Sequence, residues 1–227
     1  MGKDKLRKFA EVSKMTHVLV PSKEEMIHGS DVLRGKWNVE LFKNEAPITL
    51  ELACGKGEYT LALGRMFPQH NHIGVDIKGN RIWRGAKTSA SEKLPNVAFL
   101  RTRIESIDSF FSPNEVDQIW ITFPDPQKKG KRARKRLTHP EFLDKYRKIM
   151  KPGGRVNLKT DSSTLFDFTL DVILEQGLKV IHQSIDIYTI GIKKFPDELN
   201  TLMETKTHYE RMWLEDGKQI KFISFEL

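Results

Sequence analysis

The amino-acid sequence predicts an α/β fold, with a mostly parallel sheet covered by helices on both faces. From residue 48 onward, short apolar runs alternate with amphipathic stretches of helical length, the pattern of parallel α/β domains. The first apolar run leads into a turn with two glycines, and an acid closes the second run. Parallel sheets that bind a nucleotide-like ligand commonly carry these two features.

The expected elements follow this alternation along the chain. Seven strands are expected, at residues 48–53, 72–76, 97–101, 116–122, 155–159, 178–187 and 220–225. Four helices are expected, at residues 58–67 (stopped by Pro68), 78–93, 138–150 and 162–176 (followed by Gly177). The third helix opens with capping-box spacing between Thr138 and Glu141. Residues 193–213 fit neither rhythm and are interpreted as an insertion, helical towards its end.

Composition limits the class of protein. The 227 residues suffice for one large domain at 46–227, preceded by a basic, irregular and partly mobile N-terminal arm at 1–45. An excess of 38 Lys and Arg over 30 Asp and Glu, a net charge of +8, favours nucleic acid or acidic surfaces as partners. Cys54 is the single cysteine, and neither a secretion signal nor a membrane span is evident. We therefore expect a cytoplasmic protein.

The turn after the first strand reads Glu51-Leu-Ala-Cys-Gly-Lys-Gly57. Gly55 and Gly57 allow the backbone to approach a ligand closely, and Asp76 ends the next strand, where a carboxylate reaches ribose hydroxyls. A dinucleotide site has a third glycine where this chain has Thr60. The pattern therefore favours a cofactor with a ribose and no phosphate, which describes S-adenosylmethionine.

A second motif, Phe123-Pro-Asp-Pro126, follows the fourth strand. Prolines on both sides stiffen the backbone at Asp125, and residues 128–136 carry seven Lys or Arg and no acid. An isolated run of this kind is usually an exposed basic turn. Beside the cofactor turn, it predicts a site that grips a polyanion through phosphate contacts and handles one polar group on it.

These motifs resemble the bacterial tRNA (guanine-N7)-methyltransferase family over roughly residues 15–227. The resemblance also rests on four further segments: Gly74-Val-Asp-Ile-Lys-Gly-Asn-Arg-Ile-Trp-Arg-Gly-Ala-Lys87, Lys135-Arg-Leu-Thr-His-Pro140, Lys159-Thr-Asp161 and Thr207-His-Tyr-Glu210. It implies a seven-stranded class I (Rossmann-like) methyltransferase that acts on N7 of a guanosine in the tRNA variable loop. We also expect a monomer or homodimer and no metal.

The resemblance also implies roles for particular residues. The residues expected at the cofactor are Glu51, Gly55, Gly57, Asp76, Arg103 and Asp125, and Asp125 also serves the reacting centre. The residues expected at the tRNA are Lys128, Asp161, Thr207, His208, Tyr209 and Glu210. Two positions depart from the family pattern: Gln127 stands where many relatives have Trp, and Arg103 stands where many have an acid. Glu105 and Asp108 are candidates to replace that acid.

The chemistry expected of such a site needs no general base, because N7 of guanine carries a free lone pair at neutral pH. Catalysis then depends on alignment and on stabilising the positive charge that moves to the purine. Two alternatives stay open at this stage. One is methylation of an exocyclic base amine, and the other is a catalytically silent RNA-binding module with the same fold.

Overall fold

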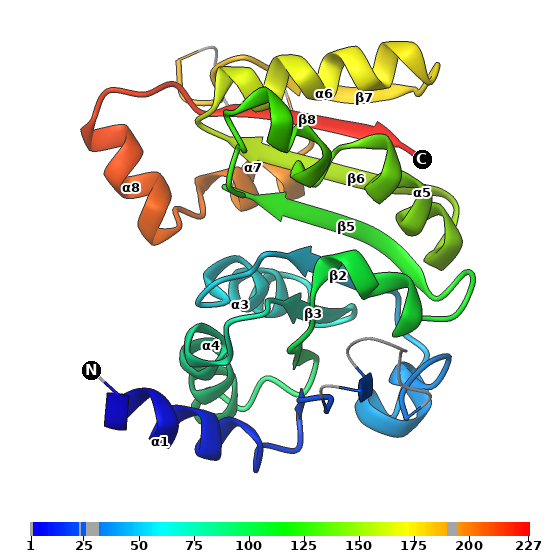
Figure 1. The fold of residues 1–227 in the computed structure, drawn as a ribbon, viewed down its shortest axis with the longest axis vertical. Coiled ribbons are helices and arrows are strands. Elements are labelled where there is room, and N and C mark those ends of the chain that lie inside the picture. The colour runs from blue at the N-terminus through cyan, green and yellow to red at the C-terminus, as the bar shows by residue number, and fades with distance from the viewer. Residues whose placement is uncertain (1, 23, 26–31, 190–194) are drawn as a thin grey trace.

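The protein is described from a computed structural model, which places residues 2–22, 24–25, 32–189 and 195–227 (Figure 1). Its strands are β1 (Val18–Leu19), β2 (Ile48–Leu52), β3 (Asn71–Val75), β4 (Val97–Leu100), β5 (Val116–Thr122), β6 (Met150–Thr160), β7 (Val180–Ser184) and β8 (Lys221–Glu226). Its α-helices are α1 (Gly2–Val12), α3 (Glu58–Met66), α4 (Gly79–Ser91), α5 (Pro140–Ile149), α6 (Ser163–Glu175), α7 (Asp197–Glu204) and α8 (His208–Glu215). Three shorter helical turns are η1 (Trp37–Phe42), η2 (Ile104–Ser109) and η3 (Gly130–Lys135).

The described strands form one sheet in the order β1-β4-β3-β2-β5-β6-β8-β7. Strand β8 runs antiparallel to both β6 and β7, and the other pairs are parallel. The chain order reverses between β2 and β5, and in open sheets such a switch point is where ligands bind, beyond the carboxyl ends of the strands. The predicted α/β class with a mostly parallel sheet is confirmed, but the sheet has eight strands instead of seven.

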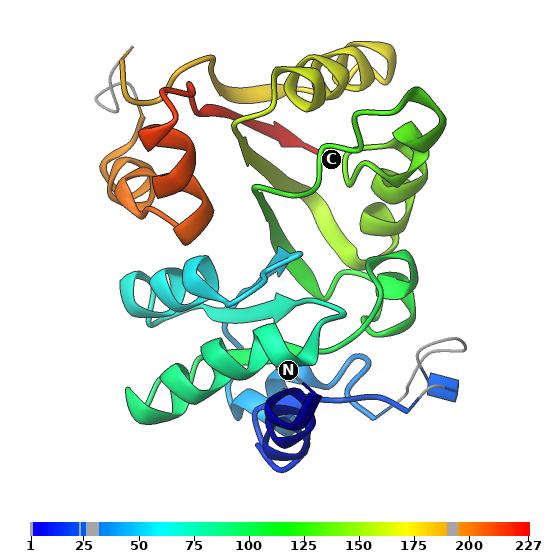
Figure 2. The same cartoon turned by 60° about the vertical axis from the view of Figure 1, so that its left-hand side comes forward.

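Helices cover both faces of the sheet, as Figure 2 shows. One face carries the largest apolar cluster, in which strand residues such as Ile119 and Ile121 pack with Phe142 of α5 and Phe166 of α6. On the other face, α3 and α7 enclose a smaller cluster around Trp120, while α1 packs on α4. The two faces are not equally apolar.

Two segments among the first 45 residues, α1 and β1, have regular structure. Helix α1 packs on α4 through Trp83, whose indole Nε1 donates to Glu11 at 2.6 Å and whose ring lies under Lys8 at 4.9 Å. Strand β1 pairs in parallel with β4. The expectation of an irregular arm is therefore wrong for these two segments, because α1 is amphipathic and β4 offers a free sheet edge. A domain boundary near residue 45 stays a prediction.

Two further details differ from the sequence expectations. Thr138 does not cap α5: its hydroxyl lies 2.8 Å from that of Thr169, and His139 caps the helix by accepting from the Glu141 backbone N–H. The expected insertion contains α7 and most of α8, which continues past residue 213 to Glu215, while residues 193 and 194 lie outside the described part of the chain.

Candidate active site

The turn after β2 uses left-handed backbone at three of five positions. Ala53, Gly55 and Gly57 have φ values of 59°, 56° and 71°, a region that residues other than glycine rarely adopt. A Cβ at Gly57 would lie 2.7 Å from the Phe99 ring, whereas a Cβ at Gly55 would meet nothing closer than 4.0 Å. Gly57 is therefore required by packing, and Gly55 leaves bare backbone beside a cavity.

Two buried acids fix this turn. Glu51, 2 % exposed, accepts from the Thr60 backbone N–H at 2.7 Å, from the Thr60 hydroxyl, and from the Thr122 hydroxyl at 2.7 Å. Burial raises the pKa of Glu51 to about 7, although these hydrogen bonds lower it. Asp76 accepts from the backbone N–H groups of Gly55 at 3.0 Å and Lys78 at 2.7 Å. Thr60, found where a dinucleotide site has glycine, is thus the partner of Glu51.

Three adjoining cavities lie beyond the carboxyl ends of the strands. A cavity of about 310 Å³ beside β3 and β4 shares Ala53 and Asp76 with a narrow cavity of about 230 Å³. The narrow cavity in turn shares Asp125 and Tyr209 with a third cavity of about 870 Å³. Asp125 therefore stands where the narrow cavity meets the large one.

The two smaller cavities have the chemistry that S-adenosylmethionine requires. The side cavity offers the apolar side chains of Ile77 and Ile104 to a purine, with Asp76 placed for ribose hydroxyls. The Thr102 hydroxyl, a member of its lining, is buried and has no hydrogen-bond partner among the described residues. The narrow cavity has Glu51 and the glycine turn in its lining. These residues fit the cofactor.

Arg103 and Glu105 both line the side cavity, as expected. Asp108, the other candidate for the adenine amino group, is not in that lining. Its carboxylate pairs with Lys145 and with Lys148, each at 3.1 Å. Asp108 is therefore ruled out as an adenine contact, and Glu105 remains the candidate.

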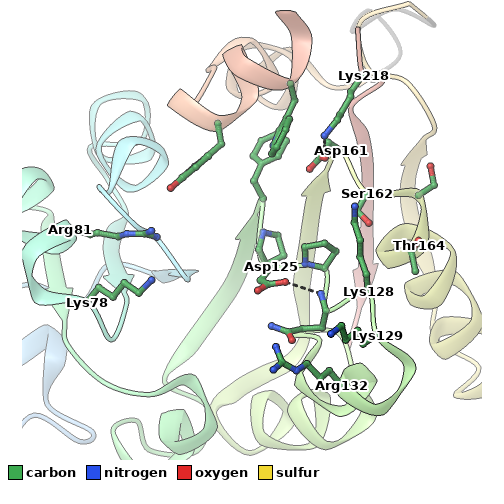
Figure 3. Close-up of a pocket in the computed structure, with 17 residues that line it drawn as sticks. Lys78, Arg81, Asp125, Lys128, Lys129, Arg132, Asp161, Ser162, Thr164 and Lys218 are labelled. Atoms are coloured by element: carbon green, nitrogen blue, oxygen red, sulfur yellow. Dashed lines mark hydrogen bonds and ion pairs between the residues drawn. The ribbon is translucent and has the colours of Figure 1, made fainter. Parts of the chain in front are cut away.

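The largest cavity is strongly basic (Figure 3). Its cationic lining residues are Lys78, Arg81, Lys128, Lys129, Arg132 and Lys218. Its acids are Asp125 and Asp161, which follow β5 and β6. In Figure 3, Lys78, directly before α4, and Arg81 of α4 extend towards Asp125, with Lys128 and Arg132 on its other side. The predicted juxtaposition of one acid with a cationic strip is present in the structure.

The loop that carries Asp125 is held by its own backbone and by one arginine. Phe123 and Gln127 have φ values of 48° and 47°, and an Asp125 carboxylate oxygen accepts from the Gln127 backbone N–H at 2.9 Å. Arg136 is 7 % exposed, donates to the Pro126 carbonyl at 3.2 Å and lies 4.5 Å over the Phe168 ring. The expectation that Arg136 contacts RNA phosphates is therefore wrong, because its guanidinium holds the loop from inside.

The residues of the segment 207–210 have three different roles. Thr207 caps α8 by accepting from the Glu210 backbone N–H, and both Thr207 and Tyr209 line the narrow cavity. Tyr209, 41 % exposed, also lines the basic cavity. His208 lines neither, and its backbone N–H donates to Glu58 at 2.8 Å.

Glu210 is fully buried and does not reach the cavities. Its carboxylate lies 2.8 Å from Lys159 Nζ, and both side chains are 0 % exposed. The Tyr188 hydroxyl donates to Glu210 at 2.8 Å. The prediction that Glu210 contacts tRNA directly is therefore wrong: the ion pair joins α8 to β6.

Sequence reasoning assigned no role to Lys159, Trp213 or Lys218. Lys159 stands in a segment that carries the resemblance, but nothing local predicts that it is buried, because a lysine in a strand is normally exposed. Lys218 pairs with Asp161 at 3.2 Å and lies 3.3 Å over the Trp213 ring. Trp213 could have been found as an aromatic residue one helical turn after Tyr209.

Among the described residues, no cluster of His, Cys, Asp and Glu side chains could hold a metal ion. No described helix is both long enough and apolar enough to span a bilayer.

Comparison with known proteins identifies the family. Residues 45–223 match Methyltransf_4, a methyltransferase family. A tRNA (guanine-N(7)-)-methyltransferase of Christiangramia forsetii is 47% identical over 226 residues, covering 100% of this chain and 99% of that protein. One from Porphyromonas gingivalis is 50% identical over 195 residues, covering 86% and 77%, and one from Clostridium acetobutylicum is 32% identical over 194 residues, covering 86% and 87%.

Solved structures with the same fold are more distant in sequence. The 16S rRNA methyltransferase KamB superposes with a TM-score of 0.61 at 16% identity, over 87% of this chain and 94% of that one. A 16S rRNA (adenine(1408)-N(1))-methyltransferase variant from Catenulisporales acidiphilia, solved with cosubstrate SAM, gives 0.54 at 14% identity, over 83% and 88%. With its cofactor turn, its basic cavity and relatives that match over 86% to 100% of its length, the chain belongs to the tRNA (guanine-N(7)-)-methyltransferase family of class I enzymes, for which S-adenosylmethionine is the methyl donor.

Proposed function

We propose that this protein methylates N7 of a guanosine in the variable loop of tRNA in the cytoplasm. The observation that carries the proposal is the position of Asp125. It lines both the narrow cavity, which holds the glycine turn, and the basic cavity. A group bound by Asp125 therefore lies where a methyl donor and a polyanion meet.

The basic cavity suits an RNA loop. Its exposed cations attract phosphates, and this attraction supplies affinity and salt sensitivity with little sequence information. Tyr209, which is 41 % exposed, offers a ring face in the same lining, on which an unstacked base can rest. Loop guanosines fit better than helical ones, because the deep and narrow major groove of A-form RNA hides N7.

We assign Asp125 a positioning and electrostatic role. S-adenosylmethionine supplies an activated methyl group on a sulfonium. The carboxylate of Asp125 accepts hydrogen bonds from the Watson–Crick edge of guanine, which turns N7 on the opposite edge towards the donor. Its negative charge also favours the cationic product. No histidine lines the three cavities within the described residues, and the N7 lone pair requires no base.

The substrate test uses labelled S-adenosylmethionine and an unmodified tRNA transcript. The control transcript has its variable-loop guanosine replaced by adenosine. We expect label on the first transcript alone, together with chain cleavage under conditions selective for N7-methylguanosine. Label on both would move the target elsewhere and favour an exocyclic amine. No label with intact cofactor binding would indicate a silent binder or another substrate.

The role of Asp125 is tested by Asp125→Asn beside Asp171→Asn, since Asp171 is an exposed acid of α6. We expect Asp125→Asn to lower kcat by roughly tenfold to a hundredfold, the range expected for a lost charge-assisted contact in the transition state. Asp171→Asn should keep the turnover of the wild type and, in calorimetry, its affinity for S-adenosylmethionine. Unchanged turnover in Asp125→Asn would remove the assignment.

A further inference from the structure

The sheet has one apolar face and one unusually polar face. Parallel strands covered on both sides are normally apolar on both, as they are towards α5 and α6. On the opposite face the strands present polar side chains at alternating positions. Their register places them side by side: Thr49 pairs with His72 and Gln118, and Ser224 pairs with Asn157 and His182.

At the carboxyl ends of the strands, the polar side chains of this face are bonded by other side chains of the protein. Glu51 is bonded by two threonines, and Lys159 by Glu210. At the amino ends the polar side chains instead surround a cavity of about 280 Å³. Thr49 lies four residues before Ala53 of the cofactor turn, roughly 13 Å along an extended chain. The cavity is therefore distinct from the three cavities of the methyl-transfer site, with which it shares no lining residue.

Two side chains in the cavity lining have buried polar atoms without partners. Trp120 Nε1 and His72 Nδ1 have no hydrogen-bond partner among the described residues. Both residues are only 1 % exposed, so solvent does not replace the missing partner. An unsatisfied buried donor or acceptor costs about 1–3 kcal/mol. Because these atoms lie in the wall of a cavity, a ligand bound there can supply the hydrogen bonds that they lack.

The charge of the lining selects the kind of ligand. Arg155, His70, His72 and His182 line the cavity, and among the residues whose side chains the structure describes no Asp or Glu does. Arg155 also makes no ion pair with any described residue. Burial, and then the nearby Arg155, lowers the pKa of His182. This corner of the cavity is therefore short of negative charge.

The apolar part of the lining limits the size and shape of the ligand. Leu63 and Phe67 come from α3 and its end, and Leu199 and Leu202 from α7. A volume of about 280 Å³ equals that of roughly nine liquid waters. That volume accommodates a small molecule with one apolar group and one polar head.

We propose that this cavity is a second binding site, for a small organic anion whose carboxylate or phosphate contacts Arg155 and His182 while its apolar body lies between α3 and α7. Trp120 Nε1 donates to the ligand from the floor of the cavity. The site does not depend on the methyl-transfer reaction, and its test needs neither tRNA nor S-adenosylmethionine.

The test uses calorimetric titration of the full-length protein with benzoate and with phenyl phosphate, and with benzamide as the neutral analogue. We expect saturable binding of at least one anion and much weaker binding of benzamide. The anion that binds more tightly identifies the head group. Histidine ring signals in proton NMR report the location, because a bound anion raises the pKa of His182.

Three arginine variants locate the binding. Arg155→Gln should weaken the anion roughly tenfold or more, the effect of losing one charge-assisted hydrogen bond. Arg147→Gln, on α5 behind the sheet, and Arg132→Gln, in the basic cavity, should bind as wild type does. His182→Gln provides a second variant at the cavity.

Several results would overturn the proposal. They are an absence of saturable binding by either anion, equal binding of benzamide, unchanged binding in both Arg155→Gln and His182→Gln, and loss of binding in Arg132→Gln. The last result would place the anion in the methyl-transfer site.

Discussion

Replacing Glu51 with Gln is expected to change how stability depends on pH, and to do so without disturbing the turn. The Glu51 carboxylate is fully buried and bonded by Thr60 and Thr122. Gln keeps an oxygen for the two donors of Thr60, and its NH₂ group can donate to the Thr122 hydroxyl, which can rotate to accept. The substitution therefore removes the charge and preserves the shape.

The magnitude follows from the pKa. Burial raises the pKa of Glu51 from 4.5 to about 7, so between these pH values the folded protein holds a proton that the unfolded chain releases. The free energy of unfolding therefore falls as pH rises through this window. At about 1.4 kcal/mol per pH unit, the loss is about 3 kcal/mol in total. Above pH 7 the wild type keeps a buried charge that Glu51→Gln lacks.

His72 has the opposite effect in nearly the same window. Burial lowers its pKa from 6.5 to about 4, so the unfolded chain binds the proton and stability rises with pH. The wild type alone can therefore show little net dependence on pH. The difference between wild type and Glu51→Gln isolates Glu51, because His72 is common to both proteins.

The assay is urea unfolding of cofactor-free protein at several pH values from 4.5 to 8. The advantage of Glu51→Gln over wild type should grow across this range by about 3 kcal/mol, and the variant alone should gain stability up to about pH 6.5 because of His72. Parallel curves for the two proteins would refute the reasoning, since they would mean that Glu51 titrates normally in the folded state.

Three further outcomes are expected. Lys159→Met should lower the free energy of unfolding by about 3–5 kcal/mol, because it leaves Glu210 buried without its partner, and adding Glu210→Gln should recover much of the loss in urea unfolding; a double variant no more stable than the single one would contradict this. Gly57→Ala should destabilise more than Gly217→Ala by thermal unfolding, because both positions have φ near 70° but only the first meets another side chain; equal losses would exclude the steric clash. Lys128→Gln should reduce the slope of log affinity for tRNA against log salt by about 1, and an unchanged slope would remove Lys128 from the phosphate contacts.

The parts of the fold that sequence predicted are those with a strong local pattern. The strand at 116–122 was predicted with its observed bounds, because Pro113-Asn-Glu precedes it and the Phe123-Pro-Asp-Pro126 motif follows it. Strand β1 has only two residues and exists because β4 offers an edge to pair with, a tertiary cause that no local pattern records. Helix α1 depends in the same way on the exposed face of α4 around Trp83.

The candidate site shows the same limit at the level of single residues. Motif spacing brought Glu51, Asp76 and Asp125 to one end of the sheet, because the turns that follow parallel strands must meet there. It could not separate the members of a motif that point outward from those that point inward. Thr207 and Tyr209 line the cavities, while Glu210 turns into the core towards Lys159.

The basic run after Asp125 also contains both inward-pointing and outward-pointing side chains. Its seven cations are equivalent as a pattern of charge, yet Arg136 is buried under the loop and stacked on Phe168. The loop needs such a support, because left-handed backbone at Phe123 and Gln127 costs free energy that surrounding contacts must offset. The charge that positions Asp125 and the charges that attract a polyanion therefore come from one segment. Only the direction of each side chain, which depends on the fold, assigns it to one role or the other.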